Sequence, residues 1–458
     1  MTSWTIFIFG MSGDLAKRQI IPALYALFQI RKKTGHIFTI IGAGHDASTV
    51  EAIIDSSKPF IEKIDEQTLS DFVDACSYYH VDFDNPQNFA DFVKHIMMQK
   101  DALSDNRLAY MAVPADYFCS LTKALTAAHV LERGNTQHHI VYEKPFGWDR
   151  NSAQEINGCI AHVIDQNQIY RIDHYLTKGL VSNIILMRFS NIIFEPVWNH
   201  SHIDHVEIIL DESIGIEGRG SYYDRYGALK DVVQNHMLQM LALIAMEEPK
   251  SIDEKDIEEK KVEVLKQVKI KEVVLGQYEG YQKEPAVNPQ STTETFVACK
   301  LTIDLPRWLN VPFYLRTGKN LNQKLTAIII TFKEMKSCFI KTADQCAPNV
   351  LTITMSPDEG FRLLLNAKKP YSADEVTTAA MDFCYSCLFG PETPQAYVTL
   401  LQSIFAGDHS VSVSSQEIDY QWSIIDAIKA HSFPILPYKK NSQGPAAAIK
   451  LLSQKDHV

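Results

Sequence analysis

Two short stretches place charged residues at the ends of apolar runs. One is VYEKPFGWDR at 141–150 and the other is RIDHYLTKGL at 171–180, and they include two lysines, a histidine and two aspartates. Such cations can bind a phosphorylated substrate, because a buried phosphate needs cationic or N–H partners. The alternative is that these residues only solvate the ends of two strands.

Two glycines lie where an apolar run ends and a helical pattern begins. They are Gly10 and Gly13 in FGMSGDL, a position where backbone N–H groups and a helix N-terminus can bind a pyrophosphate. Glycines alone would be more typical of a tight turn between a strand and a helix. Here the preceding strand and the following amphipathic helix supply the context of a dinucleotide-binding motif, so we expect a dinucleotide cofactor.

The end of the second strand bears on the choice between the two nicotinamide cofactors. A carboxylate there binds a ribose 2′-hydroxyl, whereas an arginine pairs with a 2′-phosphate. The sequence has His45 and Asp46 at this point. Asp46 is compatible with an unphosphorylated ribose or with an N-cap of the next helix, so these residues leave the choice open.

Strands and helices alternate in the first part of the chain and position these residues. Apolar runs predict strands at 4–10, 37–44, 107–113 and 138–143. Helical periodicity predicts helices that span 14–35, 87–99 and 117–131. This alternation indicates an α/β, Rossmann-like, doubly wound parallel sheet, and we assign residues 1–172 to a dinucleotide-binding domain.

The pattern changes in the remainder of the chain. Alternating runs predict antiparallel strands at 205–210, 293–303, 324–332 and 349–355, with a helical stretch at 227–246. We therefore expect residues 173–458 to form an α+β domain with a large, mainly antiparallel sheet, which binds substrate.

Composition excludes several classes of partner. The 458 residues include 44 Lys and Arg against 55 Asp and Glu, and a net charge of −11 argues against nucleic acid and anionic membranes. We see no secretory signal and no run of membrane-spanning length.

Eight scattered cysteines predict reduced thiols in a cytoplasm. The C-x-x-C of Cys384 and Cys387 is more typical of packing than of metal or redox chemistry.

Several motifs resemble, in order and approximate spacing, those of the glucose-6-phosphate dehydrogenase family. They are GMSGDLAKR, YMAVP, EKPFG, RIDHYLTK, RFSNIIFEPVWN, GRGSYYDRYGALKDVVQNHMLQ and VPFYLRTGK, within a resemblance from about residue 5 to about residue 447. The resemblance implies oxidation of carbon 1 of a hexose 6-phosphate to the lactone, in the pentose phosphate pathway, with hydride transfer to NADP or NAD. It also implies a homodimer or higher homo-oligomer, whose contacts we assign to the second domain.

The same resemblance assigns a catalytic pair. His236 in DVVQNHMLQ matches the family's base, and Asp173 in RIDHYL matches its carboxylate partner. A neutral imidazole can accept a proton at physiological pH, and a neighbouring carboxylate fixes its tautomer and stabilises the imidazolium. Outside this motif, a histidine beside an apolar helical stripe would be more typical of a structural, hydrogen-bonded residue.

The resemblance also assigns ligand contacts. Lys144 matches a lysine between sugar and cofactor, followed by Pro145 where the family has a cis peptide. The remaining substrate contacts are His174, Tyr175 and Lys178 for the phosphate, with Glu212, Asp231 and Lys319 for the sugar. The cofactor contacts are Gly10, Ser12, Gly13, Asp14, Leu15, His45 and Lys144, and no metal site is expected. Taken alone, Glu212 would be a surface acid and Asp231 a helix N-terminal charge.

Five positions depart from the family pattern. Gln19 replaces the usual lysine, His45 replaces the cofactor-selecting arginine, and Thr177 and Gly179 replace the glycine and glutamate of YLGKE. Ser356 stands where many relatives have a glutamine. Because the catalytic pair and the phosphate lysine remain, we favour a working dehydrogenase with altered cofactor or sugar preference. The alternatives are a dehydrogenase of another hexose phosphate and a catalytically silent nucleotide-binding paralogue.

Overall fold

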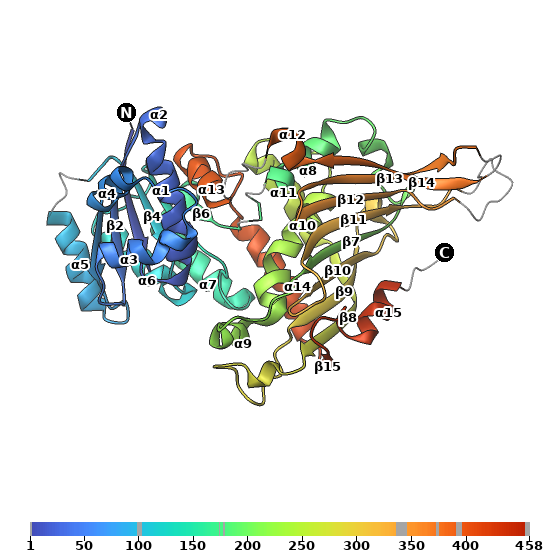
Figure 1. Ribbon diagram of the computed structural model, residues 1–458. Coiled ribbons are helices and arrows are strands. Elements are labelled where there is room, and N and C mark those ends of the chain that lie inside the picture. The colour runs from blue at the N-terminus through green and yellow to red at the C-terminus, as the bar shows by residue number, and fades with distance from the viewer. Residues whose placement is uncertain are drawn as a thin grey trace. The chain divides into compact units, whose positions relative to one another are not determined.

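The computed structural model describes residues 2–98, 103–173, 175–176, 179–335, 346–371, 375–390 and 396–453. The chain forms two compact units, whose elements are labelled in Figure 1. The first unit combines Met1–Thr177 with Pro394–Ile418, and the second combines Lys178–Thr393 with Asp419–Val458.

The first unit contains a six-stranded sheet in which every neighbouring pair is parallel, in the order β3-β2-β1-β4-β5-β6. The strands are β1 (Thr2–Phe9), β2 (His36–Gly44), β3 (Cys76–His80), β4 (Asn106–Met111), β5 (His138–Tyr142) and β6 (Ile169–Arg171). The strand order reverses between β1 and β4, as in doubly wound dinucleotide-binding folds. The predicted parallel α/β sheet is therefore confirmed.

Helices connect these strands, and one further helix of the unit comes from the later segment Pro394–Ile418. The connecting helices are α1 (Ile21–Gln29), α2 (Arg31–Thr34), α3 (Val50–Ser57), α4 (Glu66–Asp74), α5 (Pro86–Met98), α6 (Phe118–Ala127) and α7 (Arg150–Ala161), and the further helix is α13 (Ala396–Phe405). The single helix expected over 14–35 is divided, because Ala16–Ile20 forms a π-helical segment, η1, and a break at Ile30 separates α1 from α2. Its expected end at Gly35 is confirmed, since Gly35 caps α2 with a φ of 71°.

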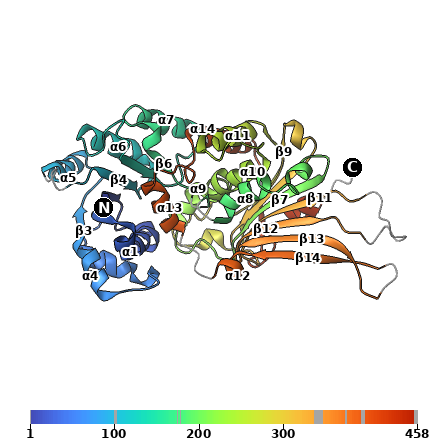
Figure 2. The ribbon, with the colours of Figure 1, turned by 90° about the horizontal axis from the view of Figure 1, so that it is seen from above.

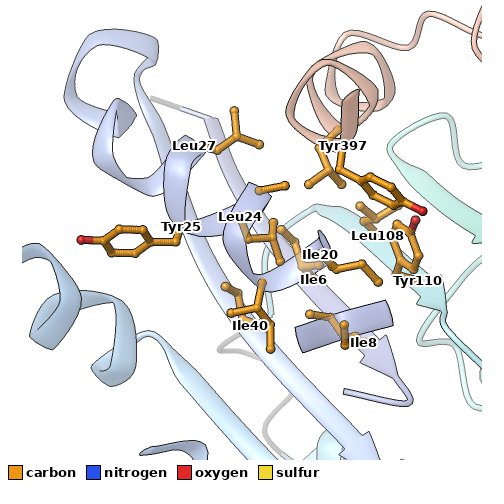
Figure 3. Packing of buried hydrophobic residues seen from close by; sticks show 14 of the residues in the cluster. Ile6, Ile8, Ile20, Leu24, Tyr25, Leu27, Ile40, Leu108, Tyr110 and Tyr397 are labelled. Atoms are coloured by element: carbon orange, nitrogen blue, oxygen red, sulfur yellow. The ribbon is translucent and has the colours of Figure 1, made fainter. Parts of the chain in front are cut away.

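One apolar cluster joins the strands of the first unit to its helices (Figure 3). Ile6 and Ile8 of β1 pack with Leu24 of α1, and Tyr397 of α13 belongs to the same cluster. The segment after α13 also meets the edge of the sheet, where Val413 N–H donates to the carbonyl of Arg171 over 2.9 Å. The sequence pattern assigns all residues after 172 to the second domain. The structure instead packs 394–418 with the first unit, through long-range contacts that local periodicity does not encode.

The second unit contains a nine-stranded sheet in the order β14-β13-β12-β11-β7-β10-β9-β8-β15. Its strands are β7 (Ile203–Asp211), β8 (Val268–Tyr278), β9 (Phe296–Ile303), β10 (Phe313–Gly318), β11 (Leu325–Phe332), β12 (Val350–Ser356), β13 (Gly360–Lys368), β14 (Val376–Cys384) and β15 (Ile435–Tyr438). Two neighbouring pairs, β7 with β10 and β8 with β15, are parallel, and the other pairs are antiparallel. The expected large, mainly antiparallel sheet is confirmed.

Most helices of the second unit gather on one face of this sheet (Figure 2). The helices of the unit are α8 (Gly179–Phe189), α9 (Gly220–Ala228), α10 (Leu238–Ala245), α11 (Glu254–Lys266), α12 (Tyr385–Phe389), α15 (Ala446–Ser453) and, from Asp419 on, α14 (Ser415–Lys429). The helical stretch expected over 227–246 combines a π-helix, η7 (Leu229–Met237), with α10. Within the described residues, no helix combines the length and the apolar character that a membrane crossing requires.

Two cysteine pairs differ from the expectation of reduced thiols. Cys119 is bonded to Cys159, and Cys384 is bonded to Cys387, while Cys299 is a free, buried thiol. The first pair forms because α6 packs against α7 and brings together residues that are 40 positions apart. Compositional reasoning from scattered cysteines was wrong for both pairs.

Candidate active site

The glycine-rich turn lies at the carboxyl end of β1, where the strand order reverses. Gly10 has a φ of 90°, and a Cβ atom there would lie less than 3.0 Å from the carbonyl oxygen of Ala112. The Gly10 N–H donates to the carbonyl of Ala43 over 2.7 Å, and the Gly13 N–H donates to that of Gly10 over 2.9 Å. Helical structure begins at Asp14. Tight packing therefore requires glycine at position 10, and the turn leads into a helix N-terminus that can bind a phosphate group.

The other side chains of this turn differ in exposure. Ser12 is buried, and a Cβ atom on Gly44 would lie 2.7 Å from its hydroxyl oxygen. Asp14 is exposed and accepts from Arg18 Nε over 2.6 Å, and Leu15 packs against the apolar cluster. The structure thus brings all five predicted residues of the turn together at one sheet edge.

His45 follows β2 at the same edge of the sheet. Its imidazole lies edge-on to the Phe83 ring, with 5.1 Å between ring centroids, and its Nδ1 lies 3.7 Å from Asp82 Oδ1. Asp84 lies in the same exposed group and accepts from Tyr117 over 2.6 Å, and this hydrogen bond raises the pKa of Tyr117 to about 12. Two carboxylates therefore lie close to His45, which the resemblance places at the position of the cofactor-selecting arginine.

Lys144 and Asp173 occupy equivalent positions past neighbouring strands. Tyr142 and Arg171, the last residues of β5 and β6, pair in parallel register, and Lys144 and Asp173 each lie two positions after the end of the strand. Asp173 is buried, and its Oδ1 accepts from the Tyr175 N–H over 2.9 Å. Lys144 is half-buried and precedes a cis Lys144–Pro145 peptide. The structure therefore brings these two predicted residues to one edge of the first unit.

Sequence reasoning missed a buried acid beside this pair. Glu143 accepts from the Tyr110 hydroxyl over 2.5 Å and from the Tyr397 hydroxyl over 3.2 Å. Burial raises the pKa of Glu143, the two hydrogen bonds and Lys144 oppose that shift, and Asp173 adds to it. The available signal was an acid within the apolar end of a predicted strand, which requires partners when buried.

Part of the predicted phosphate site lies outside the described residues. His174, Lys178 and the departure at Thr177 fall there. Tyr175 is described and half-buried, and Gly179 opens α8.

The second unit holds an ion pair at the carboxyl ends of its two parallel central strands. Gly318 of β10 pairs with Asp211 of β7, so the next residues, Lys319 and Glu212, lie side by side and form an ion pair. Lys319 is 3% exposed, and its Nζ lies 5.5 Å from the centroid of the Tyr223 ring. These contacts stabilise a cation that would otherwise be costly to bury.

The π-helix η7 supplies the remaining predicted residues. Asp231 is 7% exposed and accepts from the Tyr222 hydroxyl over 3.2 Å, and His236 is 2% exposed further along the same helix. Burial raises the pKa of Tyr223, and the carboxylates of Asp231 and Glu212 raise it further, so both acids act on one phenol. π-Helical segments are rare and often occur at functional sites. Tyr222 and Tyr223 were not singled out from the sequence, although they lie in one of the quoted motifs.

Asp173 belongs to the first unit and His236 to the second. Their pairing as acid and base therefore stays a prediction.

Two more of the positions that depart from the family pattern are described. Gln19 is exposed within η1, and Ser356 ends β12.

A doubly wound parallel sheet with a glycine turn at its strand-order reversal defines the class of Rossmann-type dinucleotide-binding proteins. Two family models then match consecutive parts of the chain. The model described as glucose-6-phosphate dehydrogenase, NAD binding domain, matches residues 7–183, and the C-terminal domain model of that enzyme matches residues 185–458. The chain belongs to the glucose-6-phosphate dehydrogenase family.

Individual relatives agree with this assignment. Glucose-6-phosphate 1-dehydrogenase of Bacillus subtilis is 36% identical over 98% of this chain and 96% of its own length. The enzyme of Treponema pallidum is 35% identical over 98% of this chain and 93% of its own. A solved structure of a glucose-6-phosphate dehydrogenase in complex with glucose 6-phosphate has a TM-score of 0.88 at 31% identity, covering 100% of this chain and 98% of that one. The Mycobacterium avium structure has a TM-score of 0.86 at 32% identity, covering 98% and 96%.

Proposed function

We propose that the protein oxidises carbon 1 of glucose 6-phosphate to 6-phosphogluconolactone and passes the hydride to NADP. The observation that carries this proposal is the match of both family models, which together cover nearly the whole chain. NADP, when bound, supplies the nicotinamide ring that accepts the hydride. The turn from Gly10 to Leu15 would hold its phosphates, since it offers backbone N–H groups at the start of a helix.

In this proposal His236 accepts the proton of the hydroxyl group on carbon 1 while the hydride leaves the same carbon. Asp173 orients the imidazole and stabilises the imidazolium that forms. The burial of both side chains supports these roles, because a poorly solvated imidazole and carboxylate interact more strongly than exposed ones.

The remaining residues hold the sugar phosphate. His174, Tyr175 and Lys178 bind the phosphate, and Lys144 lies between sugar and cofactor. Glu212, Asp231 and Lys319 bind sugar hydroxyl groups, a role supported by their common position around Tyr223. Ion pairing of Lys319 with Glu212 would fix both side chains before the sugar arrives.

Three finer points belong to the same proposal. The protein acts in the cytoplasm, supplies the pentose phosphate pathway, and forms a homodimer or a higher homo-oligomer. The pathway and the assembly follow from the family resemblance, and closed two-fold dimers are the commonest assembly of soluble chains. Dual use of NAD is compatible with His45 at the position of the cofactor-selecting arginine.

The test is steady-state reduction of NADP and NAD with a panel of hexose phosphates. We expect glucose 6-phosphate to give the highest kcat/KM, and His236→Asn to lower kcat by about 10²-fold or more with little change in sugar affinity. His205→Asn is the matched control, because His205 is buried near the opposite end of β7 from Glu212. Turnover by His236→Asn at the parental rate, or a clear preference for another hexose phosphate, would overturn the proposal.

A further inference from the structure

The pair Cys384 and Cys387 joins the end of an edge strand to a short helix. Cys384 is the last residue of β14, and Cys387 lies within α12. Figure 2 labels both elements. The two residues are disulfide-bonded, with 5.2 Å between their Cα atoms. We propose that this pair is a site of thiol–disulfide exchange with an external thiol, and that the Cys387 sulfur is the atom attacked.

The strand ladder holds Cys384 in place. Cys384 pairs with Gly360 of β13, where a Cβ atom would lie less than 3.0 Å from the Phe383 carbonyl oxygen. The next residue, Tyr385, donates its N–H to the carbonyl of Glu359 over 2.9 Å. Cys384 therefore stays fixed by the β13–β14 pairing when the sulfur–sulfur bond opens.

The two cysteine residues differ in exposure. Cys387 and its neighbour Ser386 are exposed, whereas Cys384 is half-buried. An attacking thiolate must approach along the sulfur–sulfur axis, so the exposed sulfur is the one it reaches. Exposure alone therefore directs the first attack to Cys387.

The hydrogen bonds at Cys384 favour the same direction. Its Sγ accepts from the Cys387 N–H over 3.2 Å and lies 3.5 Å from the Ser386 hydroxyl oxygen. Such donors stabilise a thiolate more than a thiol, and a stabilised thiolate leaves faster in disulfide exchange. Cys384 is thus arranged as the leaving sulfur.

The exchange balances as two displacements. An external thiolate attacks Cys387 Sγ, a mixed disulfide forms, and Cys384 leaves as a thiolate. A second donor thiolate, from the same molecule of a dithiol or from a second molecule of a monothiol, then attacks the donor's sulfur in the mixed disulfide, and Cys387 leaves as the second thiolate. The donor is oxidised to a disulfide and the cysteine pair gains two electrons, and the reverse sequence oxidises the pair again.

Four other cysteines supply internal controls. Cys119 and Cys159 are a second disulfide, held between two packed helices and half-buried at both ends. Cys76 and Cys299 are free, and burial raises the pKa of each thiol to about 12, so few thiolates form there at neutral pH. An external thiol should therefore react with the exposed pair before it reacts with Cys76, Cys299 or the Cys119–Cys159 disulfide.

The test uses the full-length protein and glutathione as the donor. Brief exposure of the oxidised protein, acid quenching and peptide mapping by mass spectrometry should place the glutathione adduct on Cys387 about tenfold more often than on Cys384. Longer exposure followed by alkylation should label this pair well before Cys119 and Cys159. A Cys384→Ser/Cys387→Ser variant, checked for folding by circular dichroism, sets the background.

Three outcomes would overturn the proposal: alkylation of Cys384 and Cys387 without any reductant, equal adduct on both, or reduction no faster than that of the Cys119–Cys159 pair. None of these readouts depends on dehydrogenase turnover, so the result is independent of the proposed function.

Discussion

Replacement of Gly10 by alanine tests the packing of the turn from Gly10 to Leu15. At a φ of 90°, an L side chain costs about 1–2 kcal/mol of folding free energy. The new Cβ atom would also lie less than 3.0 Å from the Ala112 carbonyl oxygen, and overpacking of this kind costs about 1–3 kcal/mol. We therefore expect Gly10→Ala to lower the free energy of unfolding by about 2–5 kcal/mol, measured by urea denaturation.

The matched control is Gly35→Ala in the same unit. Gly35 has a φ of 71°, and no other atom lies within 4 Å of the position that a Cβ atom would take, so its replacement should cost only the conformational part, about 1–2 kcal/mol. The difference between the two variants measures the close approach of β1 to the end of β4. Equal losses in the two variants would refute the packing described for this turn. In the folded fraction of Gly10→Ala, displaced N–H groups should also weaken NADP binding, measured by fluorescence titration.

Three further predictions concern charged residues. Burial raises the pKa of Glu143, so above the ordinary value of 4.5 the folded state keeps this proton while the unfolded state loses it, and the free energy of unfolding falls as pH rises. Glu143→Gln should flatten this fall when the midpoint of urea denaturation is measured against pH, and an unchanged slope would contradict the prediction. His45→Arg should raise the NADP-to-NAD ratio of kcat/KM by about tenfold, since a charged hydrogen bond to the 2′-phosphate is worth about 1–3 kcal/mol; an unaltered ratio would show that the 2′-phosphate lies elsewhere. Lys319→Met leaves the Glu212 carboxylate without its ion pair and should lower kcat/KM for glucose 6-phosphate by about thirtyfold, or about 2 kcal/mol, whereas a parental value would exclude a sugar contact.

Local patterns predicted eight of the fifteen strands that the structure describes, and they did not predict the contacts between distant segments. Apolar runs identified β1 at 4–10, where the strand spans Thr2–Phe9, and the alternation with helices predicted the parallel sheet. Periodicity could not reveal the π-helical segment Ala16–Ile20 or the return of α13 to the first unit, because both depend on packing.

The site was predicted mainly through motif resemblance. Spacing alone could not place Lys319 beside Glu212, since this depends on a parallel pair of strands inside a mainly antiparallel sheet. Glu143 was missed because its partners, Tyr110 and Tyr397, come from distant parts of the chain. The Cys119–Cys159 and Cys384–Cys387 disulfides were missed for related reasons: the first depends on helix packing, and the second on a turn whose conformation the C-x-x-C spacing leaves open.

In the proposed mechanism His236 removes the substrate proton with Asp173 as its partner. The most direct measurement is the pH dependence of kcat/KM for glucose 6-phosphate in the parent and in Asp173→Asn. We predict that kcat/KM falls with decreasing pH as one group takes up a proton, and that the substitution lowers both the plateau and the pH of that inflection, because a carboxylate stabilises the imidazolium. An inflection that stays at the same pH in Asp173→Asn, with the same plateau, would contradict the role of Asp173 as the partner of His236.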